Sequence, residues 1–221
     1  MRRLKWVLAA LLLFLTVLLT ATFYVAGDRA YYHDFQVNHH IDQATRRSQE
    51  ELDEVSKNLS AYLKEGKDEL LTPYYQEHEI AHMRDVHQLF RLGRLVRAVS
   101  LLLLIGIVVH AFVLGDIHGL KKSLPRASFL WLALFSAFAL FCVFFWDTAF
   151  TGFHKLFFSN DLWRMDPAKD FMIQMLPAPF FIGMALRVFL LSLLGVGIFL
   201  FLLHGVISYR QQKGEYRDPR S

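Results

Sequence analysis

Residues 188–209 read VFLLSLLGVGIFLFLLHGVISY and contain no Asp, Glu, Lys or Arg. A helix needs roughly 20 apolar residues to cross a bilayer core of about 30 Å, so this stretch is long enough to span a membrane. Three more charge-free stretches of comparable length occupy residues 6–26, 98–115 and 127–146. The sequence therefore predicts an all-α membrane protein with four transmembrane helices.

The overall composition agrees with this class. Of the 221 residues, 54% are hydrophobic and 15% aromatic, and the mean hydropathy is +0.31. Soluble domains are about 45–50% apolar, and here the excess is concentrated in the four blocks. This distribution excludes a soluble enzyme, a secreted domain and a nucleic-acid-binding protein, so the net charge of +4 has to be interpreted by position.

The positions of Lys and Arg predict the orientation of the four helices. Residues 1–5, 116–127 and 210–221 together contain ten basic and three acidic residues, whereas residues 27–94 contain nine basic and 13 acidic ones. Lys and Arg near the ends of transmembrane helices mark the cytoplasmic side. Both termini are therefore expected in the cytoplasm and both larger connections outside.

These observations give a predicted plan for the chain. The first apolar stretch is longer than the apolar region of a signal peptide, which has roughly 7–15 residues. It leads into Phe23 and Tyr24, so it is interpreted as an uncleaved helix. The plan consists of an N-terminal tail and first transmembrane helix (1–26), an extracytoplasmic helical cap (27–94), a second transmembrane helix (95–115), a cytoplasmic loop (116–127), a third transmembrane helix (128–150), an extracytoplasmic re-entrant or interfacial loop (151–186), a fourth transmembrane helix (187–209) and a cytoplasmic tail (210–221).

Two helices are predicted in the cap. Ser48 and Glu51 suit a capping box at the start of a helix, and Gly66 suits its end, while the apolar spacing over residues 41–66 also allows an earlier start at residue 41. A second helix is expected from about residue 78 towards residue 94, where it can join the second transmembrane helix directly. The first helix has apolar residues at helical spacing, namely Leu52, Val55, Leu59, Tyr62 and Leu63. The apolar stripe of the second helix can pack against the first helix or lie on the membrane surface.

The only cysteine, Cys142, lies inside the third predicted transmembrane helix. No intramolecular disulfide can form, and a reactive thiolate needs an accessible, electropositive site. Cys142 is therefore expected to pack against apolar neighbours.

Residues 78–82 read HEIAH and match the zincin pattern H-E-x-x-H, in which two histidines bind zinc and the glutamate is the base. A catalytic zinc needs a third protein ligand, for which Asp85 or His154 are the available side chains. The alternative is that His78 and His82 simply share a polar helix face with Asp85.

The predicted outer loop after the third transmembrane helix mixes apolar residues with a few polar ones. Asp147 and His154 are seven residues apart and share a helix face if the helix continues through Gly152. A carboxylate behind an imidazole fixes its tautomer and raises its basicity. The alternative is that Trp and Phe anchor this loop in the headgroup layer while its charged residues are solvated.

Taken in order along the chain, these short elements resemble a known family. Residues 82–86 (HMRDV) are similar to the H-M-x-D-V element of the bacterial lipoprotein intramolecular transacylase family. The resemblance continues through Asp147, residues 153–163 (FHKLFFSNDLW) and residues 166–181 (DPAKDFMIQMLPAPFF). It extends from about residue 62 to residue 181. The family pattern does not require histidine at the positions of His78 and His87, which makes the H-E-x-x-H match look accidental.

The resemblance implies an integral membrane acyltransferase of the bacterial cell membrane, with its active site at the outer face. Such an enzyme moves the sn-2 acyl chain of an S-diacylglyceryl group onto the α-amino group of the lipoprotein's N-terminal cysteine, which gives the lyso form. It implies no cofactor and no metal. The expected partners are diacylglyceryl-modified lipoproteins and membrane lipid, no nucleic acid is expected, and the protein is expected to be a monomer.

The family's two catalytic histidines correspond to His82 and His154. Aminolysis of an ester needs a proton acceptor for the amine and a proton donor for the leaving alkoxide, and two imidazoles can supply both. Which histidine is the base does not follow from the sequence. The expected supporting or substrate-binding residues are Asp85 and Asp147 as orienting carboxylates, Asn160 as a donor to the oxyanion, Asp161 and Trp163.

Two other hypotheses remain beside the transacylase. A zinc-dependent membrane peptidase using His78, Glu79 and His82 predicts stoichiometric zinc and loss of activity in Glu79→Gln. A non-enzymatic four-helix sensor predicts that neither His82 nor His154 is needed for any covalent change. The transacylase predicts that His82→Ala and His154→Ala each abolish transfer and that His78→Ala is tolerated.

Overall fold

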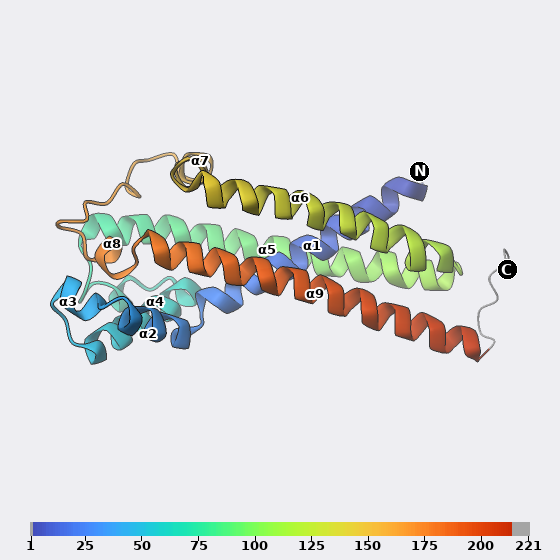
Figure 1. Cartoon of the computed structure of the whole chain (residues 1–221), viewed down its shortest axis with the longest axis horizontal. Coiled ribbons are helices and arrows are strands. Elements are labelled where there is room, and N and C mark those ends of the chain that lie inside the picture. Colours follow the sequence, from blue (N-terminus) through green and yellow to red (C-terminus); the bar gives the residue numbers. More distant parts are fainter. Residues whose placement is uncertain (1, 214–221) are drawn as a thin grey trace. The chain divides into compact units, whose positions relative to one another are not determined.

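The computed structural model describes residues 2–213, and this part of the chain contains helices and no strand (Figure 1). Part of the predicted cytoplasmic tail, residues 214–221, lies outside the described residues. The elements are α1 (Arg2–Ala26), α2 (Arg29–Asn38), α3 (Ile41–Thr45), α4 (Gln49–Glu65), the 3-10 helix η1 (Asp68–Leu70), α5 (Glu77–Val113), the π-helix η2 (Gly119–Ser123), α6 (Leu124–Phe144), α7 (Trp146–Phe157), α8 (Phe171–Met175) and α9 (Ala178–Gln212).

Four helical segments are long and apolar enough to cross a membrane: Leu4–Ala26, Glu77–Val113, Gly119–Phe144 and Ala178–Gln212. This confirms the predicted all-α fold with four transmembrane helices. The segment Glu77–Val113 is one uninterrupted helix, so the second cap helix does join the second transmembrane helix directly. At 1.5 Å per residue its 37 residues extend roughly 55 Å, well beyond the bilayer core.

The chain folds as two compact units. One is built from Met1–Ala21, Arg94–Leu140 and Val188–Ser221, and the other from Thr22–Gly93 and Phe141–Arg187. All of the site residues predicted from the sequence belong to the second unit.

The first unit is held together by apolar packing between its helices and by a few polar contacts. Lys5 pairs with Asp116 at 3.0 Å, and the indole N–H of Trp131 donates to the carbonyl of Val7 at 3.2 Å. Outward-facing residues such as Phe201, 78% exposed, have no protein neighbours to cover them, as expected of helices whose outer faces contact lipid tails. Its buried residues include Trp6, Ala9, Ala10, Leu13, Leu104, Ala111, Leu120, Leu124, Val196 and Ile207.

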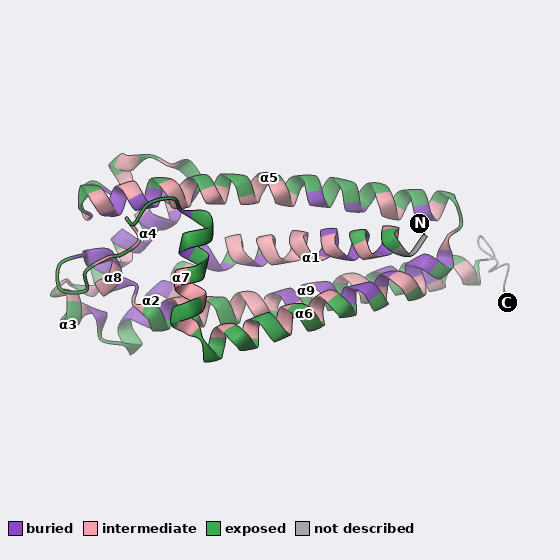
Figure 2. Ribbon diagram, turned by 90° about the horizontal axis from the view of Figure 1, so that it is seen from above, coloured by how far each residue is buried: buried purple, intermediate pink, exposed green. Residues whose placement is uncertain are grey.

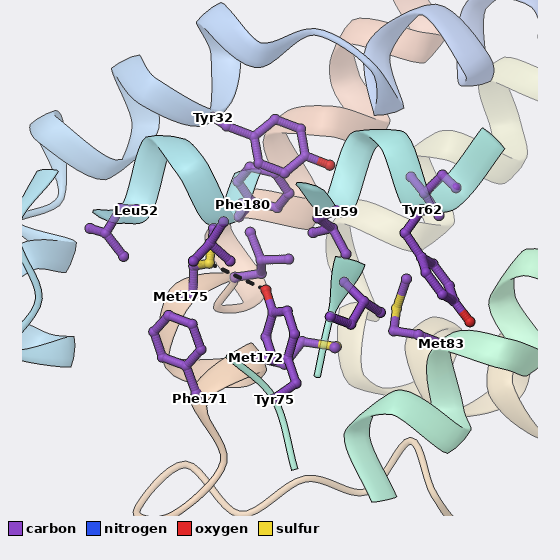
Figure 3. Packing of buried hydrophobic residues seen from close by; sticks show 14 of the residues in the cluster. Tyr32, Leu52, Leu59, Tyr62, Tyr75, Met83, Phe171, Met172, Met175 and Phe180 are labelled. Atoms are coloured by element: carbon purple, nitrogen blue, oxygen red, sulfur yellow. Dashed lines mark hydrogen bonds between the residues drawn. The ribbon is translucent and has the colours of Figure 1, made fainter. Parts of the chain in front are cut away.

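The second unit contains a continuous apolar core under α2, α4 and α8, whose buried faces are visible in Figure 2. Tyr75 lies inside this core, and its hydroxyl donates to the sulfur of Met175 at 3.5 Å (Figure 3). The core fixes the N-terminal part of α5 and the segment around α8. Its members include Tyr32, Leu52, Leu59, Tyr62, Leu71, Met83, Phe171, Met172 and Phe180.

The capping signals of the cap helix are confirmed, and of its two possible starts the structure has the one at the Ser48 capping box. Ser48 accepts from the backbone N–H of Glu51, and the Glu51 side chain accepts from the backbone N–H of Ser48. Gly66 ends α4 in the left-handed conformation (φ +70°). Residues 41–66 are not one helix, however, because Arg46 is also left-handed (φ +55°) and separates α3 from α4. The capping box at Ser48 favours a new helix start there over continuation of α3.

The expected third transmembrane helix at residues 128–150 is interrupted. The helix ends at Phe144, Phe145 leaves the helical conformation (φ −126°, ψ 47°), and α7 starts at Trp146. The sequence stays apolar across the break, so hydropathy gives no sign of it. Asp147 in the first turn of α7 favours a new start, because a negative charge is stabilising at a helix N-terminus.

Candidate active site

The structure brings His82 and His154 together. His82 lies in the N-terminal part of α5 and His154 lies in α7, and each residue is only 8% exposed. Their ring centroids are 6.1 Å apart, and the ring planes are inclined by 33°. Two imidazoles at this separation can each reach one end of a small group placed between them.

The position of His154 follows from the amphipathic character of α7. Phe153, Leu156 and Phe157 are exposed, whereas His154 lies on the buried face of the helix. The helix continues through Gly152, so His154 and Asp147 do lie on one helix. Helix α7 therefore turns an imidazole inward and a row of apolar side chains outward.

The tautomer of His154 is defined by its hydrogen bond. Its Nδ1 lies 2.7 Å from the carbonyl oxygen of Phe150, one turn earlier. Because a carbonyl oxygen can only accept, Nδ1 carries the proton and Nε2 of the neutral ring has the free lone pair. Burial lowers the pKa of His154 below its usual 6.5, although the Phe150 carbonyl opposes this effect. His154 is therefore neutral at pH 7, with Nε2 available as a base.

Aromatic rings enclose both imidazoles. The indole of Trp163 stacks on His154 with ring centroids 4.7 Å apart and planes inclined by 27°. Phe158 contacts both imidazoles, at 5.2 Å from His82 and 5.5 Å from His154. Phe150 lies 4.2 Å from His154. Phe150 and Phe158 were not among the site residues predicted from the sequence, although the density of Phe in residues 150–158 was a usable signal.

Asn160 connects α5 to the loop that follows α7. Its Nδ2 donates to Asp85 Oδ2 at 2.8 Å, and its backbone carbonyl accepts from Trp163 Nε1 at 3.1 Å. Its Oδ1 also accepts from the backbone N–H of Leu162 at 3.1 Å. Asn160 thus holds the indole that stacks on His154, and one of its amide hydrogens is used by Asp85.

The orienting roles expected of the carboxylates are not seen as direct bonds. Within residues 2–213, His82 makes no side-chain hydrogen bond with Asp85, and its Nδ1 is buried without a partner. Asp147 is exposed in the first turn of α7, and the partner of His154 is the Phe150 carbonyl instead. Asp161 is also exposed and pairs with Arg164 at 3.1 Å.

The H-E-x-x-H residues do not assemble as a zinc site. Glu79 is fully buried, and its carboxylate accepts from the backbone N–H groups of Gln76 and Met172, each at 2.7 Å. His78 Nε2 instead contacts Asp170 Oδ1 at 3.0 Å. In the described chain no three His, Cys, Asp or Glu side chains are grouped as ligands for a metal ion. His78 and Glu79 attach α8 to the start of α5, and His82 alone faces the site.

Four apolar helices and a buried pair of histidines in an aromatic enclosure define a multi-pass membrane protein with a site for proton-transfer chemistry. The sequence profile of the family described as lipoprotein intramolecular transacylase Lit matches residues 7–181. The chain therefore belongs to the lipoprotein intramolecular transacylase family. It is a membrane acyltransferase whose substrates are lipoproteins.

Solved structures give the same fold. The structure of the membrane-integral lipoprotein intramolecular transacylase Lit from Bacillus cereus is similar, with a TM-score of 0.80 and 21% identity over 96% of this chain and 98% of that one. Two variants of that protein, in which a histidine is replaced by arginine or alanine, each give a TM-score of 0.78 at 23% identity. They cover 97% of this chain and 94% and 96% of their own chains. A comparison with curated protein sequences finds no match.

Proposed function

We propose that this enzyme transfers the sn-2 acyl chain of an S-diacylglyceryl cysteine to the α-amino group of the same cysteine. The observation that carries the proposal is the pair of buried imidazoles, His82 and His154, with ring centroids 6.1 Å apart. The reaction needs one proton removed from the nucleophile and one delivered to the leaving group, which are the two tasks of such a pair. No enzyme nucleophile and no cofactor take part in this mechanism.

The defined tautomer of His154 supports its assignment as the base, with His82 as the acid. The amine nitrogen attacks the ester carbonyl carbon, and His154 Nε2 accepts a proton from that nitrogen as the N–C bond forms. The C–O bond to glycerol then breaks, and the glyceryl oxygen takes a proton from the imidazolium form of His82. His154 afterwards gives up its proton and His82 takes one up, so both rings return to their starting forms. One ester and one amine become one amide and one alcohol, so no water or redox partner is consumed. Because amine and ester belong to one substrate, the site only needs to hold them together.

Asn160, Trp163 and Asp85 are proposed as supporting residues. Asn160 and Trp163 fix the ring of His154 through the contacts described above. The second amide hydrogen of Asn160 can face the oxyanion that develops during attack. No role in the reaction is assigned to Asp147 or Asp161, whose side chains are exposed.

We also propose that the site faces the outer side of the cell membrane, with both termini in the cytoplasm and the enzyme acting as a monomer. The distribution of Lys and Arg supports this orientation. Both histidines belong to the connections expected outside, residues 27–94 and 151–186. The exposed Phe153, Leu156 and Phe157 suit the boundary between headgroups and acyl chains, where a diacylglyceryl group resides.

The test is mass spectrometry of the N-terminal lipopeptide of a reporter lipoprotein coexpressed with the protein or its variants. We expect an N-acyl, S-monoacylglyceryl cysteine with the wild type, and the unchanged diacylglyceryl form with His82→Ala or His154→Ala. His33→Ala is the matched control, because His33 is an exposed histidine of the cap that pairs with Asp53. The proposal is wrong if well-expressed wild-type protein leaves the lipopeptide unchanged.

A further inference from the structure

Asp85 lies half-buried on α5, and it forms no ion pair with any Lys or Arg side chain of residues 2–213. It is three residues after His82, so the two side chains are neighbours on one helix face. One carboxylate oxygen, Oδ2, accepts from Asn160 Nδ2 at 2.8 Å. No hydrogen bond or ion pair to Oδ1 is formed within the described residues. Because Asp85 is only partly buried, its Oδ1 is open to a donor from outside the chain.

The basic side chains nearest in sequence are already engaged elsewhere. Arg84 pairs with Asp68 at 2.7 Å and with Glu77 at 2.9 Å. Arg164 pairs with Asp161 at 3.1 Å and lies over the ring of Trp163. The titratable groups that interact with Asp85 are His82 on its own helix and Tyr62 on α4. His154 on α7 faces His82 across the site. Neither arginine neutralises Asp85.

We propose that Asp85 binds the α-ammonium group of the substrate's N-terminal cysteine and selects lipidated proteins whose amine is free. The inference rests on the proposed function and names how the site recognises the reacting group. The α-amino group is the one cation that a diacylglyceryl cysteine must carry, since its pKa of about 7.7–8.0 keeps it largely protonated at neutral pH. An ammonium N–H donating to Asp85 Oδ1 supplies the missing partner through a charge-assisted bond.

The position of Asp85 also defines where the first proton goes. His82 precedes Asp85 by three residues on the same face of α5, so an ammonium group bound at Oδ1 would lie beside the His82 ring. Transfer of one ammonium proton to His82 leaves a neutral amine with a lone pair for attack and creates the imidazolium that later protonates the glyceryl oxygen. The second proton leaves the amine for His154 when the amide bond forms. Overall, the ammonium substrate gives amide, alcohol and one proton, which His154 releases to water.

Direct binding separates this inference from the transfer itself. The probes are a radiolabelled diether analogue of S-diacylglyceryl-Cys-Ser amide, which has no ester to transfer, and its des-amino counterpart. We expect the full-length wild-type protein at pH 6.5 to bind the ammonium probe roughly tenfold or more tightly than the des-amino probe. Asp85→Asn should abolish the preference, because Asn can still accept from Asn160 but has no charge. Glu77→Gln is the control, since Glu77 is an exposed carboxylate of the same helix that pairs with Arg84.

A kinetic experiment gives a second readout that a purely structural role would not produce. With the diester peptide, Asp85→Asn should raise KM roughly tenfold at pH 7, and the defect should shrink towards pH 9.5, where the amine is neutral without the enzyme. A defect that is equal at every pH, or a wild type that binds both probes equally, overturns the inference. If the ammonium preference depends on Asp85 but no N-acyl product forms from the diester peptide, the proposed transfer is wrong and the recognition stands.

Discussion

Trp163 stacks on His154 with ring centroids 4.7 Å apart, while its indole N–H donates to the backbone carbonyl of Asn160. Asn160 in turn donates to Asp85, so the ring of His154 is held by a chain of contacts that begins on α5. Residues 160–163 thus link the two helices that supply the histidines. The position of the two imidazoles relative to each other therefore depends on residues 160–163 as well as on α5 and α7.

Shortening Trp163 should therefore reduce transfer without abolishing it. An aromatic pair contributes about 0.5–1.5 kcal/mol, and 1.36 kcal/mol is a factor of ten in rate, so Trp163→Ala should lower kcat roughly two- to tenfold. Trp163→Phe keeps the stacked ring but loses the bond to Asn160, and its kcat should lie between those of Ala and the wild type. Initial rates with a synthetic diacylglyceryl peptide measure this order. A Phe variant that is as slow as the Ala variant would show that the stacked ring is not what matters.

The protonation of His154 should depend on its burial. Because burial lowers the pKa of His154 below 6.5, less than half of the ring should be protonated at pH 6.5, where half of free imidazole is protonated. The unfolded chain then binds more protons than the folded one, so His154 costs stability as the pH falls below about 6.5 and costs none well above it. Titration of ¹³C-labelled histidine by NMR, with His154→Gln for assignment, checks the pKa directly. In Trp163→Ala the pKa should rise towards 6.5, and a His154 that titrates above 6.5 in the wild type would contradict the burial argument.

The helices of this fold could be predicted from sequence because the bilayer imposes a minimum length on every apolar span. Lipid requires long charge-free stretches, and the four that were found correspond to four helices. The break at Phe145 was missed and the break at Arg46 was left open beside a continuous helix, because neither site contains Pro or Gly. In both places the deciding feature is a favourable start of the next helix, which competes with continuation and is invisible to hydropathy.

The candidate site was predictable only in part. The short motifs identified His82 and His154 as site residues. The distance of 6.1 Å between their ring centroids depends on how α7 packs, and the spacing of residues in the sequence does not predict this packing. The Phe150 carbonyl that defines the tautomer of His154 is a backbone group, so its role cannot be seen in residue types. The H-E-x-x-H match shows the limit of a short pattern. Two of its residues, His78 and Glu79, attach α8 through Asp170 and Met172, because the ends of buried segments need hydrogen-bond partners.

Glu79 should prove structural. Its carboxylate satisfies two buried backbone N–H groups, and hydrogen bonds to charged groups contribute about 1.5–3 kcal/mol each. Glu79→Gln presents an amide N–H to one of these donors, so it should destabilise the protein by roughly 2–3 kcal/mol. Thermal inactivation of the purified protein in detergent measures the loss, with Glu77→Gln as the exposed control.

The same variant separates a structural glutamate from a zincin base. Glu79→Gln protein that remains folded at low temperature should keep measurable transfer, and its rate should not respond to a zinc chelator. A zincin glutamate would behave differently, because its replacement removes the base and abolishes activity in fully folded protein. Normal thermal stability combined with complete loss of activity would contradict the structural role.

Gly66 should be the least replaceable glycine of the cap, because two independent constraints apply to it. Its φ of +70° disfavours any residue with a Cβ by about 1–2 kcal/mol. An added Cβ would also lie 2.6 Å from Nε2 of His87 on α5. Gly66→Ala should therefore destabilise the protein by more than the backbone conformation alone explains. Gly106→Ala is the control, because Gly106 lies in α5 with nothing within 4 Å of its Cβ position.

A double-mutant cycle can separate the two constraints on Gly66. His87→Ala removes the ring that the new methyl group would strike, so Gly66→Ala should cost less in that background, and the difference should be about 0.5–3 kcal/mol. The remaining cost should match the left-handed backbone, because His87→Ala does not change φ. Apparent unfolding temperatures of the four proteins in one detergent give the comparison. Additive effects would show that α4 and α5 do not approach each other at Gly66 and His87 as closely as the structure indicates.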